Sequence, residues 1–147
     1  MDDCYEVIND ILVNLFHEIY ELEEKAIITD EFKDLSINDM HIIEAIGLGA
    51  GNNMSTIARK MNITVGSLTT SMNSIVNKKY AIRIRSEMDR RVVYIRLTPK
   101  GEKAFLHHQE FHRKMTKAVV AHLSGQEIKV LSKALGNLGT FFRGYQV

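Results

Sequence analysis

The sequence predicts a mainly α-helical fold with one small β-hairpin. Apolar residues recur at helical spacing in six segments, four before the hairpin and two after it. Over residues 81–86 and 91–97 the period changes to that of two strands, with residues 87–90 as the turn between them. Cap residues and glycines stand at the boundaries of the helical segments. We therefore expect four helices, a hairpin and two further helices, in that order.

The composition is that of a single globular domain. The chain has 147 residues, of which 45% are hydrophobic and 25% charged, enough to bury a core of its own. No apolar run exceeds four residues, whereas a membrane helix needs about 20. The acidic start MDDCYE does not resemble a secretory signal, and the single cysteine, Cys4, excludes an intrachain disulfide and a multi-cysteine zinc site. We expect one cytoplasmic unit over residues 1–147 with no membrane partner.

The first expected helix is long and amphipathic. Its apolar residues, between Tyr5 and Ile28, are Ile8, Ile11, Leu12, Leu15, Ile19, Leu22 and Ala26. Ser36, followed by Asp39 three residues later, forms a capping-box pattern that predicts a second helix through Ile46. Glycines at positions 47, 49 and 51 then end that helix.

The next two helices form a helix-turn-helix pattern. A short helix over about 54–61 follows Asn53 as N-cap, and Thr64 can cap a second helix that ends near Lys78. The buried stripe of the second helix is expected to be Val65, Leu68, Met72, Ile75 and Val76. Its outward residues are Gly66, Ser67, Thr69, Thr70 and Asn73. Such short polar side chains suit a helix seated in a major groove. A solvated polar face is the alternative, and this segment alone does not decide between them.

The last two helices also begin at recognisable caps. Thr98 and Pro99 supply an N-cap and a first-turn proline for a helix to about His122. Ser124 and Glu127 form a second capping-box pattern, which opens the final helix.

Charge favours DNA as the partner. Residues 1–40 carry a net charge of −10 and residues 41–147 a net charge of +11. The hairpin contains Arg83, Arg85, Arg90, Arg91 and Arg96. Arginines on a projecting hairpin can enter a minor groove, where the potential is most negative. Asp89 suits such a place only if it orients an arginine through a carboxylate–guanidinium pair. Together these features predict a DNA-binding winged helix-turn-helix.

Residues 86–101, SEMDRRVVYIRLTPKG, resemble the wing signature of the MarR family of transcriptional regulators. The order of six helices and one hairpin is similar to that family over nearly the whole chain. The resemblance implies a MarR-like homodimer, with dimerisation helices in 1–34 and 122–147, a winged domain in 35–100 and a linking helix in 99–122. The first and last helices each have an apolar stripe that is wider than a winged domain alone would cover, which fits this arrangement. The alternative is that the two helices fold back on their own domain. A two-fold dimer reads a palindromic operator whose half-sites lie about 34–36 Å apart.

The DNA contacts are expected on the helix-turn-helix and the wing. The candidate residues are Asn53, Ser55, Thr64, Gly66, Ser67, Thr69, Thr70, Asn73, Arg85, Ser86, Asp89, Arg90 and Arg91. A rival class, an acyl-carrier or lipid-binding module without DNA affinity, is disfavoured by the wing arginines. We find no nucleophile elbow, phosphate loop or metalloprotease motif, and no basic residue lies close to Cys4 in the sequence, so an enzyme is not expected.

Within the family, the chain is most similar to the FabT-type repressors of bacterial fatty-acid synthesis, over residues 36–47, 65–73, 85–93 and 111–115. That similarity implies that a long-chain acyl group on acyl carrier protein acts as co-repressor. The residues that could line an acyl slot are Phe16, Ile19, Met40, Ile43, Phe111 and Met115, each of which could equally belong to the core. One position departs from the family, which usually has glycine where this chain has Lys79; a left-handed backbone there would add strain of about 1 kcal/mol.

The histidines suggest an alternative effector. His108 and His112 are four residues apart and so lie on one helix face, a spacing that suits zinc but does not complete a site. Zinc-responding members of the family have histidines at positions similar to His41, His108 and His112. The other interpretation is that these histidines bond to backbone or to acids such as Glu110. We therefore expect no required cofactor, and the alternatives to an acyl effector are zinc or another small ligand.

Overall fold

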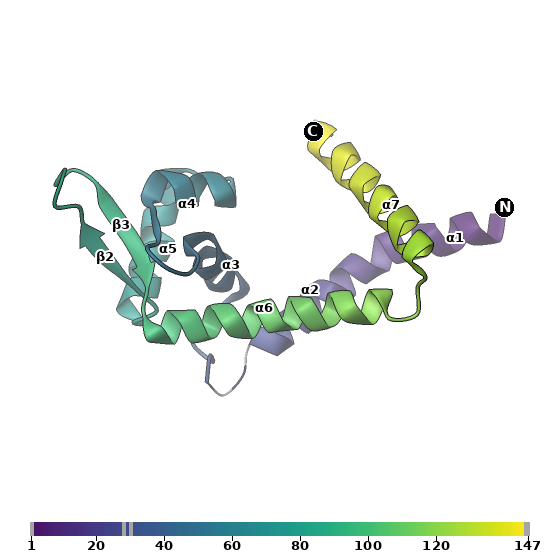
Figure 1. Cartoon of the computed structure of the whole chain (residues 1–147), viewed down its shortest axis with the longest axis horizontal. Helices are drawn as coiled ribbons and strands as arrows, with labels where there is room; N and C mark the ends of the chain where they lie inside the picture. The colour runs from purple at the N-terminus through teal and green to yellow at the C-terminus, as the bar shows by residue number, and fades with distance from the viewer. Residues whose placement is uncertain (1, 28, 30, 146–147) are drawn as a thin grey trace. The chain divides into compact units, whose positions relative to one another are not determined.

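The computed structural model describes residues 2–27, 29 and 31–145. Its elements are α1 (Asp2–Asp10), the π-helical turn η1 (Ile11–Leu15), α2 (Phe16–Ile27), α3 (Ile37–Ile46), β1 (Asn52–Asn53), α4 (Met54–Met61), α5 (Val65–Asn77), β2 (Ala81–Arg85), β3 (Val93–Leu97), α6 (Pro99–Val120) and α7 (Gly125–Gly144) (Figure 1). Contacts divide the chain into two compact units, and the boundary in the sequence falls between Phe111 and His112, inside α6. The predicted fold class, mainly helical with a small sheet, is confirmed.

The long first helix is confirmed, with one local change. α1, η1 and α2 follow one another without a break, and the backbone at both Asp10 and Phe16 is right-handed helical. The π turn from Ile11 to Leu15 was not predicted, because the apolar spacing of this stretch does not distinguish it from a regular helix. The predicted end of the helix at Ile28 lies outside the described residues.

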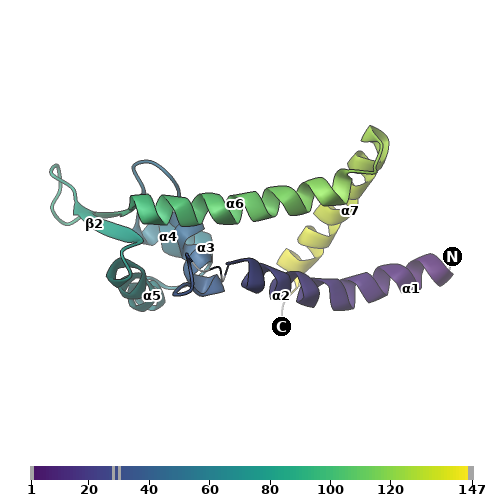
Figure 2. The same ribbon diagram turned by 90° about the horizontal axis from the view of Figure 1, so that it is seen from below.

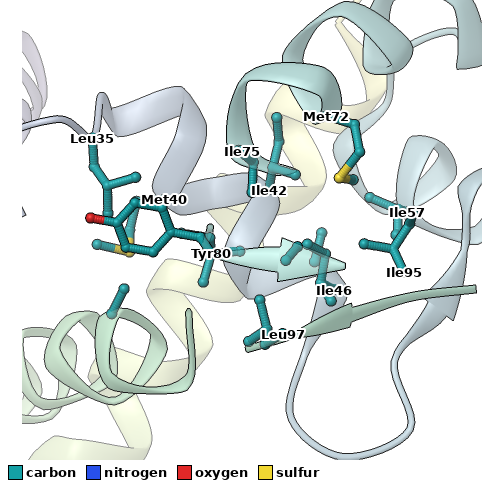
Figure 3. Packing of buried hydrophobic residues seen from close by; sticks show 14 of the residues in the cluster. Leu35, Met40, Ile42, Ile46, Ile57, Met72, Ile75, Tyr80, Ile95 and Leu97 are labelled. Atoms are coloured by element: carbon teal, nitrogen blue, oxygen red, sulfur yellow. The ribbon is translucent and has the colours of Figure 1, made fainter. Parts of the chain in front are cut away.

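The core lies among α3, α4, α5 and the sheet. Figure 3 shows Ile42, Ile46, Ile57, Ile75 and Ile95 converging from these elements, and all five side chains are fully buried. This core fixes how the helix-turn-helix and the hairpin are placed on one another.

The predicted stripe of α5 is correct except at its first residue. Leu68, Met72 and Ile75 are buried, and Val76 packs against the core. Val65 was expected to be buried but is 45% exposed. Val65 is the first residue of α5, and the buried side chains of this helix begin only at Leu68, in its first turn.

Every predicted cap forms. In α3 the Ser36 hydroxyl accepts a hydrogen bond from the Asp39 backbone N–H at 3.1 Å, and the Asp39 carboxylate accepts one from the Ser36 N–H, which completes the capping box. Asn53 and Thr64 cap α4 and α5 in the same way, by accepting from the N–H three residues ahead. The box at Ser124 opens α7. These local bonds set where each helix begins.

The sheet has three antiparallel strands in the order β1-β3-β2. β1 was not predicted, since two residues carry no alternating pattern. The other two strands are one or two residues shorter than expected, and the turn is correspondingly longer. Gly51 has φ +81°, and a Cβ there would lie 1.9 Å from the Ile95 carbonyl oxygen, so only glycine fits beside the sheet.

Lys79 ends α5 in the left-handed conformation, with φ 70°. The N–H of Tyr80 reaches back to the Ile75 carbonyl at 3.1 Å, and that of Lys79 to Val76 at 3.0 Å. Glycine is the usual residue at such a helix end. The backbone that the family's glycine would favour is therefore present here, and Lys79 adopts it at a cost of about 1 kcal/mol.

Candidate nucleic-acid interface

The helix-turn-helix presents one exposed polar side. α4 ends at Asn62, whose left-handed backbone (φ 54°) turns the chain into α5. The predicted contact residues of α5 are all exposed; they are Thr64, Gly66, Ser67, Thr69, Thr70 and Asn73. Of the two candidates at the start of α4, Ser55 is exposed, whereas Asn53 is half-buried and uses its side-chain oxygen for the cap. Figure 2 shows α5 beside strand β2.

Gly66 lies in open space on this side. A Cβ at this position would meet only the Thr64 hydroxyl, at 3.9 Å. The fold therefore does not require glycine at position 66. The missing side chain instead allows another backbone, such as that of a nucleic acid, to approach the helix closely.

Two links join this surface to the wing. Arg83 on β2 donates a short hydrogen bond from Nη2 to the Asn73 side-chain oxygen on α5. At the base of the hairpin, Thr98 donates from its hydroxyl to the Lys79 carbonyl at 2.6 Å. Arg83 is one of the hairpin arginines but not one of the predicted contact residues, because no sequence pattern links it to Asn73, ten positions earlier. Figure 1 shows the hairpin extending beyond α5.

The tip of the wing is ordered by Asp89. Its carboxylate accepts hydrogen bonds from the Arg91 backbone N–H (3.1 Å), Nε (3.1 Å) and Nη2 (3.2 Å). These bonds hold the pKa of Asp89 below its usual value, so it stays ionised. The condition under which Asp89 suits the wing tip, a carboxylate–guanidinium pair, is therefore met.

The neighbouring arginines differ in how they are held. The Arg91 side chain is 91% exposed although its guanidinium is oriented by Asp89. Arg85 donates to the Arg90 carbonyl at 3.2 Å, and the Ser86 hydroxyl accepts from the Asp89 N–H at 3.3 Å, so both support the turn from within. An exposed but pre-oriented guanidinium loses little conformational freedom on binding a phosphate or a minor groove.

A second constellation surrounds His108, which is fully buried on α6. Its Nδ1 donates to Glu44 on α3 and its Nε2 donates to Glu23 on α2, both at 2.6 Å. Burial lowers the pKa of His108, but the hydrogen bonds to Glu44 and Glu23 raise it by more, so the net pKa is above its usual value. Both ring nitrogens face carboxylate oxygens, which is the arrangement of a protonated imidazolium.

His41 lies beside this pair. Its Nε2 is 3.5 Å from Glu23, and ligand atoms of Glu23, His41 and His108 lie within 4.8 Å of one another. Imidazole nitrogens and a carboxylate suit zinc. Zinc binds a neutral imidazole, so it would compete with the proton that the raised pKa of His108 favours. The sequence singled out the two histidines and missed both glutamates. His112 belongs to the second unit.

The residues expected to line an acyl slot have different environments. Met40 and Ile43 are fully buried in the winged-domain core. Ile19 is half-buried on α2, whereas Phe16 is half exposed. Phe111 lies near the His108 ring, with the ring centroids 6.5 Å apart. Met115 is half-buried in the second unit. Met40 and Ile43 therefore belong to the core, which was the alternative interpretation. The acyl slot itself stays a prediction.

A helix-turn-helix followed by an arginine-bearing wing defines the class of winged-helix transcriptional regulators. A family model of the transcriptional regulators SarA/Rot matches residues 23–107. The structure of Streptococcus pneumoniae FabT in complex with DNA is similar at 37% identity and a TM-score of 0.85, covering 95% of this chain and 97% of that one. The regulator PchR of Bacillus subtilis is 27% identical, covering 90% of this chain and 86% of its own length. A MarR family protein from Bacillus stearothermophilus shares the fold, with 18% identity, a TM-score of 0.69 and coverage of 97% and 99%.

This chain therefore belongs to the MarR family of winged-helix transcriptional regulators. Its relatives are transcriptional regulators and not enzymes, which confirms that expectation. Among the described residues, no helix is both long and apolar enough to cross a membrane.

Proposed function

We propose that this regulator is a homodimeric repressor that binds a palindromic DNA site through α5 and the wing. The observation that carries the proposal is the pairing of an exposed polar α5 surface with Arg91, oriented by Asp89 at the wing tip. Thr70 and Asn73 would face base edges in the major groove, and Arg90 or Arg91 would enter the minor groove. Similarity to FabT, which was crystallised with DNA, supports this assignment.

Dimerisation is proposed from the exposed apolar side chains of two regions. On α1 and the following π turn, Tyr5, Ile8 and Leu12 are exposed, and on α7 so are Phe141 and Phe142. Large apolar residues gathered on one element usually mark an interaction surface. A second copy of the chain, as in the predicted MarR-like dimer, would cover them and set the spacing of two α5 helices.

The test is a fluorescence-anisotropy titration of duplexes selected from a randomised pool. We expect the affinity to fall steeply with salt, because bound arginines and lysines release counterions from the phosphates. Arg91→Ala should lose at least about tenfold in affinity across sequences, whereas Thr70→Ala should change base preference. Lys103→Ala on α6 removes the same charge and is the matched control, expected to change affinity little. A folded dimer that binds no duplex would overturn the proposal.

For the effector, we propose a long-chain acyl group carried on acyl carrier protein, acting as co-repressor at fatty-acid synthesis genes. The support is the resemblance to FabT-type repressors, together with the net positive charge of the chain beyond residue 40, which suits an acidic carrier as well as DNA. By linkage, the acyl protein must raise DNA affinity by the factor by which DNA raises acyl-protein affinity.

The effector test adds apo, short-chain or long-chain acyl carrier protein to the same DNA titration. Tighter DNA binding with the long-chain form alone supports the proposal. Equal binding with all three forms would remove acyl carrier protein as effector and leave the DNA-binding proposal in place. Phe16→Ala, at an exposed position, should abolish the long-chain effect while leaving DNA binding unchanged.

Metal control is a second candidate, favoured by the cluster of Glu23, His41 and His108. Metal analysis of chelator-free protein, with DNA affinity measured with and without zinc, tests it. Zinc binding that changes DNA affinity in the native protein but not in His41→Ala supports metal control. A metal-free protein whose DNA affinity ignores zinc would end this proposal.

A further inference from the structure

Val65, Thr69 and Asn73 form one row along α5. They are spaced four residues apart, so they follow one another on the same side of the helix, and all three are exposed. Val65 is the residue that the sequence pattern wrongly placed in the core. Its two methyl groups therefore lie on the same surface as the predicted DNA contacts.

Two threonines beside Val65 use their hydroxyl hydrogens within the protein. Thr69 donates its hydroxyl hydrogen to the Val65 carbonyl at 2.9 Å, a bond to its own helix. Thr64 donates its hydroxyl hydrogen to Ser67 Oγ at 3.0 Å and accepts from the Ser67 N–H at 3.1 Å. Neither threonine hydroxyl has its hydrogen left for a base. The exposed surface at this end of α5 is consequently more apolar than the sequence suggests.

The far end of the row has a different character. The side-chain oxygen of Asn73 accepts from Arg83, which leaves the amide nitrogen as the group able to donate. The row thus changes from methyl groups at Val65 and Thr69 to a hydrogen-bond donor at Asn73. The Val65 end of this row is therefore suited to an apolar group on a base edge, and the Asn73 end to a hydrogen-bond acceptor.

In the major groove, thymine is the only base with a methyl group, at C5. We infer that Val65 and Thr69 make the regulator select thymine in each half-site by packing against that methyl group. This inference rests on the proposed DNA-binding function and deepens it by naming a specificity determinant. Gly66 supports it, because its open position lets the neighbouring backbone approach the bases closely.

The experiment replaces single thymines by deoxyuridine, which removes only the methyl group. The duplexes are those selected from the randomised pool by the full-length dimer. One symmetric pair of thymines should respond, with an affinity loss of about fourfold per methyl contact and about fifteenfold when both half-sites are changed. Thymines elsewhere in the same duplex serve as internal controls and should not respond.

Two variants assign the effect to residues. Val65→Ala removes two exposed methyl groups, and Thr69→Ser removes one while keeping the hydroxyl and its bond to Val65. Each should bind the thymine duplex more weakly than the native protein, and at least one should lose the discrimination between thymine and deoxyuridine. Circular dichroism checks that both remain helical.

The outcomes separate this inference from the proposed function. Tight, salt-dependent binding with no response to any deoxyuridine overturns the inference and leaves DNA binding intact. Discrimination that is undiminished in both variants also overturns it, since other residues must then contact the methyl. Failure of the folded dimer to select any duplex overturns the proposed function and the inference with it.

Discussion

The winged region (α3 to β3) buries its apolar residues, whereas the two peripheral helical regions (α1 with η1, and α7) expose theirs. α3 buries seven of its ten residues, from Ile37 to Ile46. α7 buries none from Gly125 to Gly144, and Phe141 and Phe142 on it are 58% and 59% exposed. η1 likewise has no buried residue between Ile11 and Leu15. Similar apolar periodicity in the sequence thus leads to a closed core in one region and to open surfaces in the others.

The difference indicates which parts of the fold one chain completes. The winged region has its own core, so its stability should depend on contacts within the chain. The apolar surfaces of α1, η1 and α7 need a covering partner to gain the free energy of burial, which is about 25 cal/mol per Å². The proposed homodimer provides that partner.

The largest expected effect is in the winged core. Ile57→Ala should lower the free energy of unfolding by about 2–5 kcal/mol, because Ile57 is fully buried and its loss leaves a cavity. Urea denaturation followed by circular dichroism measures the change. Ile63→Ala, at an exposed apolar position, is the control and should cost less than about 1 kcal/mol. Equal costs for the two variants would contradict the assignment of the core.

A charge on the open apolar surface should act on association instead. Leu12→Asp should weaken the dimer by about 2–4 kcal/mol, that is, by more than about 30-fold in Kd, since a carboxylate would be buried in the interface. Sedimentation velocity over a range of concentrations measures this shift. The α-helical circular dichroism of the winged region should persist. An unchanged dimer would show that Leu12 lies outside any interface.

His108 supplies a pH dependence within the buried region. Its folded-state pKa is raised, so its contribution to stability is fully present below the unfolded pKa of about 6.5 and is lost as pH rises through the folded pKa. As the pH rises through this interval, the free energy of unfolding of the native protein should therefore fall by more than that of the His108→Gln variant. Urea midpoints measured from pH 5 to pH 9 test this. Parallel curves for the two proteins would mean that His108 does not titrate with folding.

The smallest expected effect on stability is at Gly66. Gly66→Ala should destabilise the fold by no more than about 0.5 kcal/mol, because a Cβ fits at this position and alanine favours helix. Duplex affinity should nevertheless fall about tenfold, since the added methyl group would separate α5 from the DNA. Thermal denaturation and anisotropy measure the two quantities. A loss of stability equal to the loss of affinity would place Gly66 in the fold and not in the interface.

Local features of the fold were predictable from the sequence, and long-range ones were not. The caps at Ser36, Asn53 and Ser124 depend on residues three apart, so short patterns define them. The family resemblance identified Lys79 as the position of a family glycine but left its backbone conformation open, and the structure shows that it is left-handed. By contrast, His108 meets Glu23 across 85 positions of sequence, and no spacing rule connects the two.

The candidate interface shows the same division. The exposure of Thr70 and Asn73 follows from helical periodicity, and the Asp89–Arg91 pair joins residues two apart. The exposure of Val65 was missed because periodicity assigns a face to each residue but does not show where the core ends. The bond from Arg83 to Asn73 depends on how β2 packs beside α5, which only the tertiary structure defines.

In the proposed assembly, two copies of this chain, joined through their open apolar surfaces, bind one palindromic DNA site through two winged regions. Native mass spectrometry of the protein with a selected palindromic duplex tests it directly, with the duplex cut to a single half-site for comparison. We predict complexes of two chains per full duplex, and an affinity at least about 100-fold weaker for the half-site. One chain per duplex, or equal affinity for the full and half sites, would contradict this assembly.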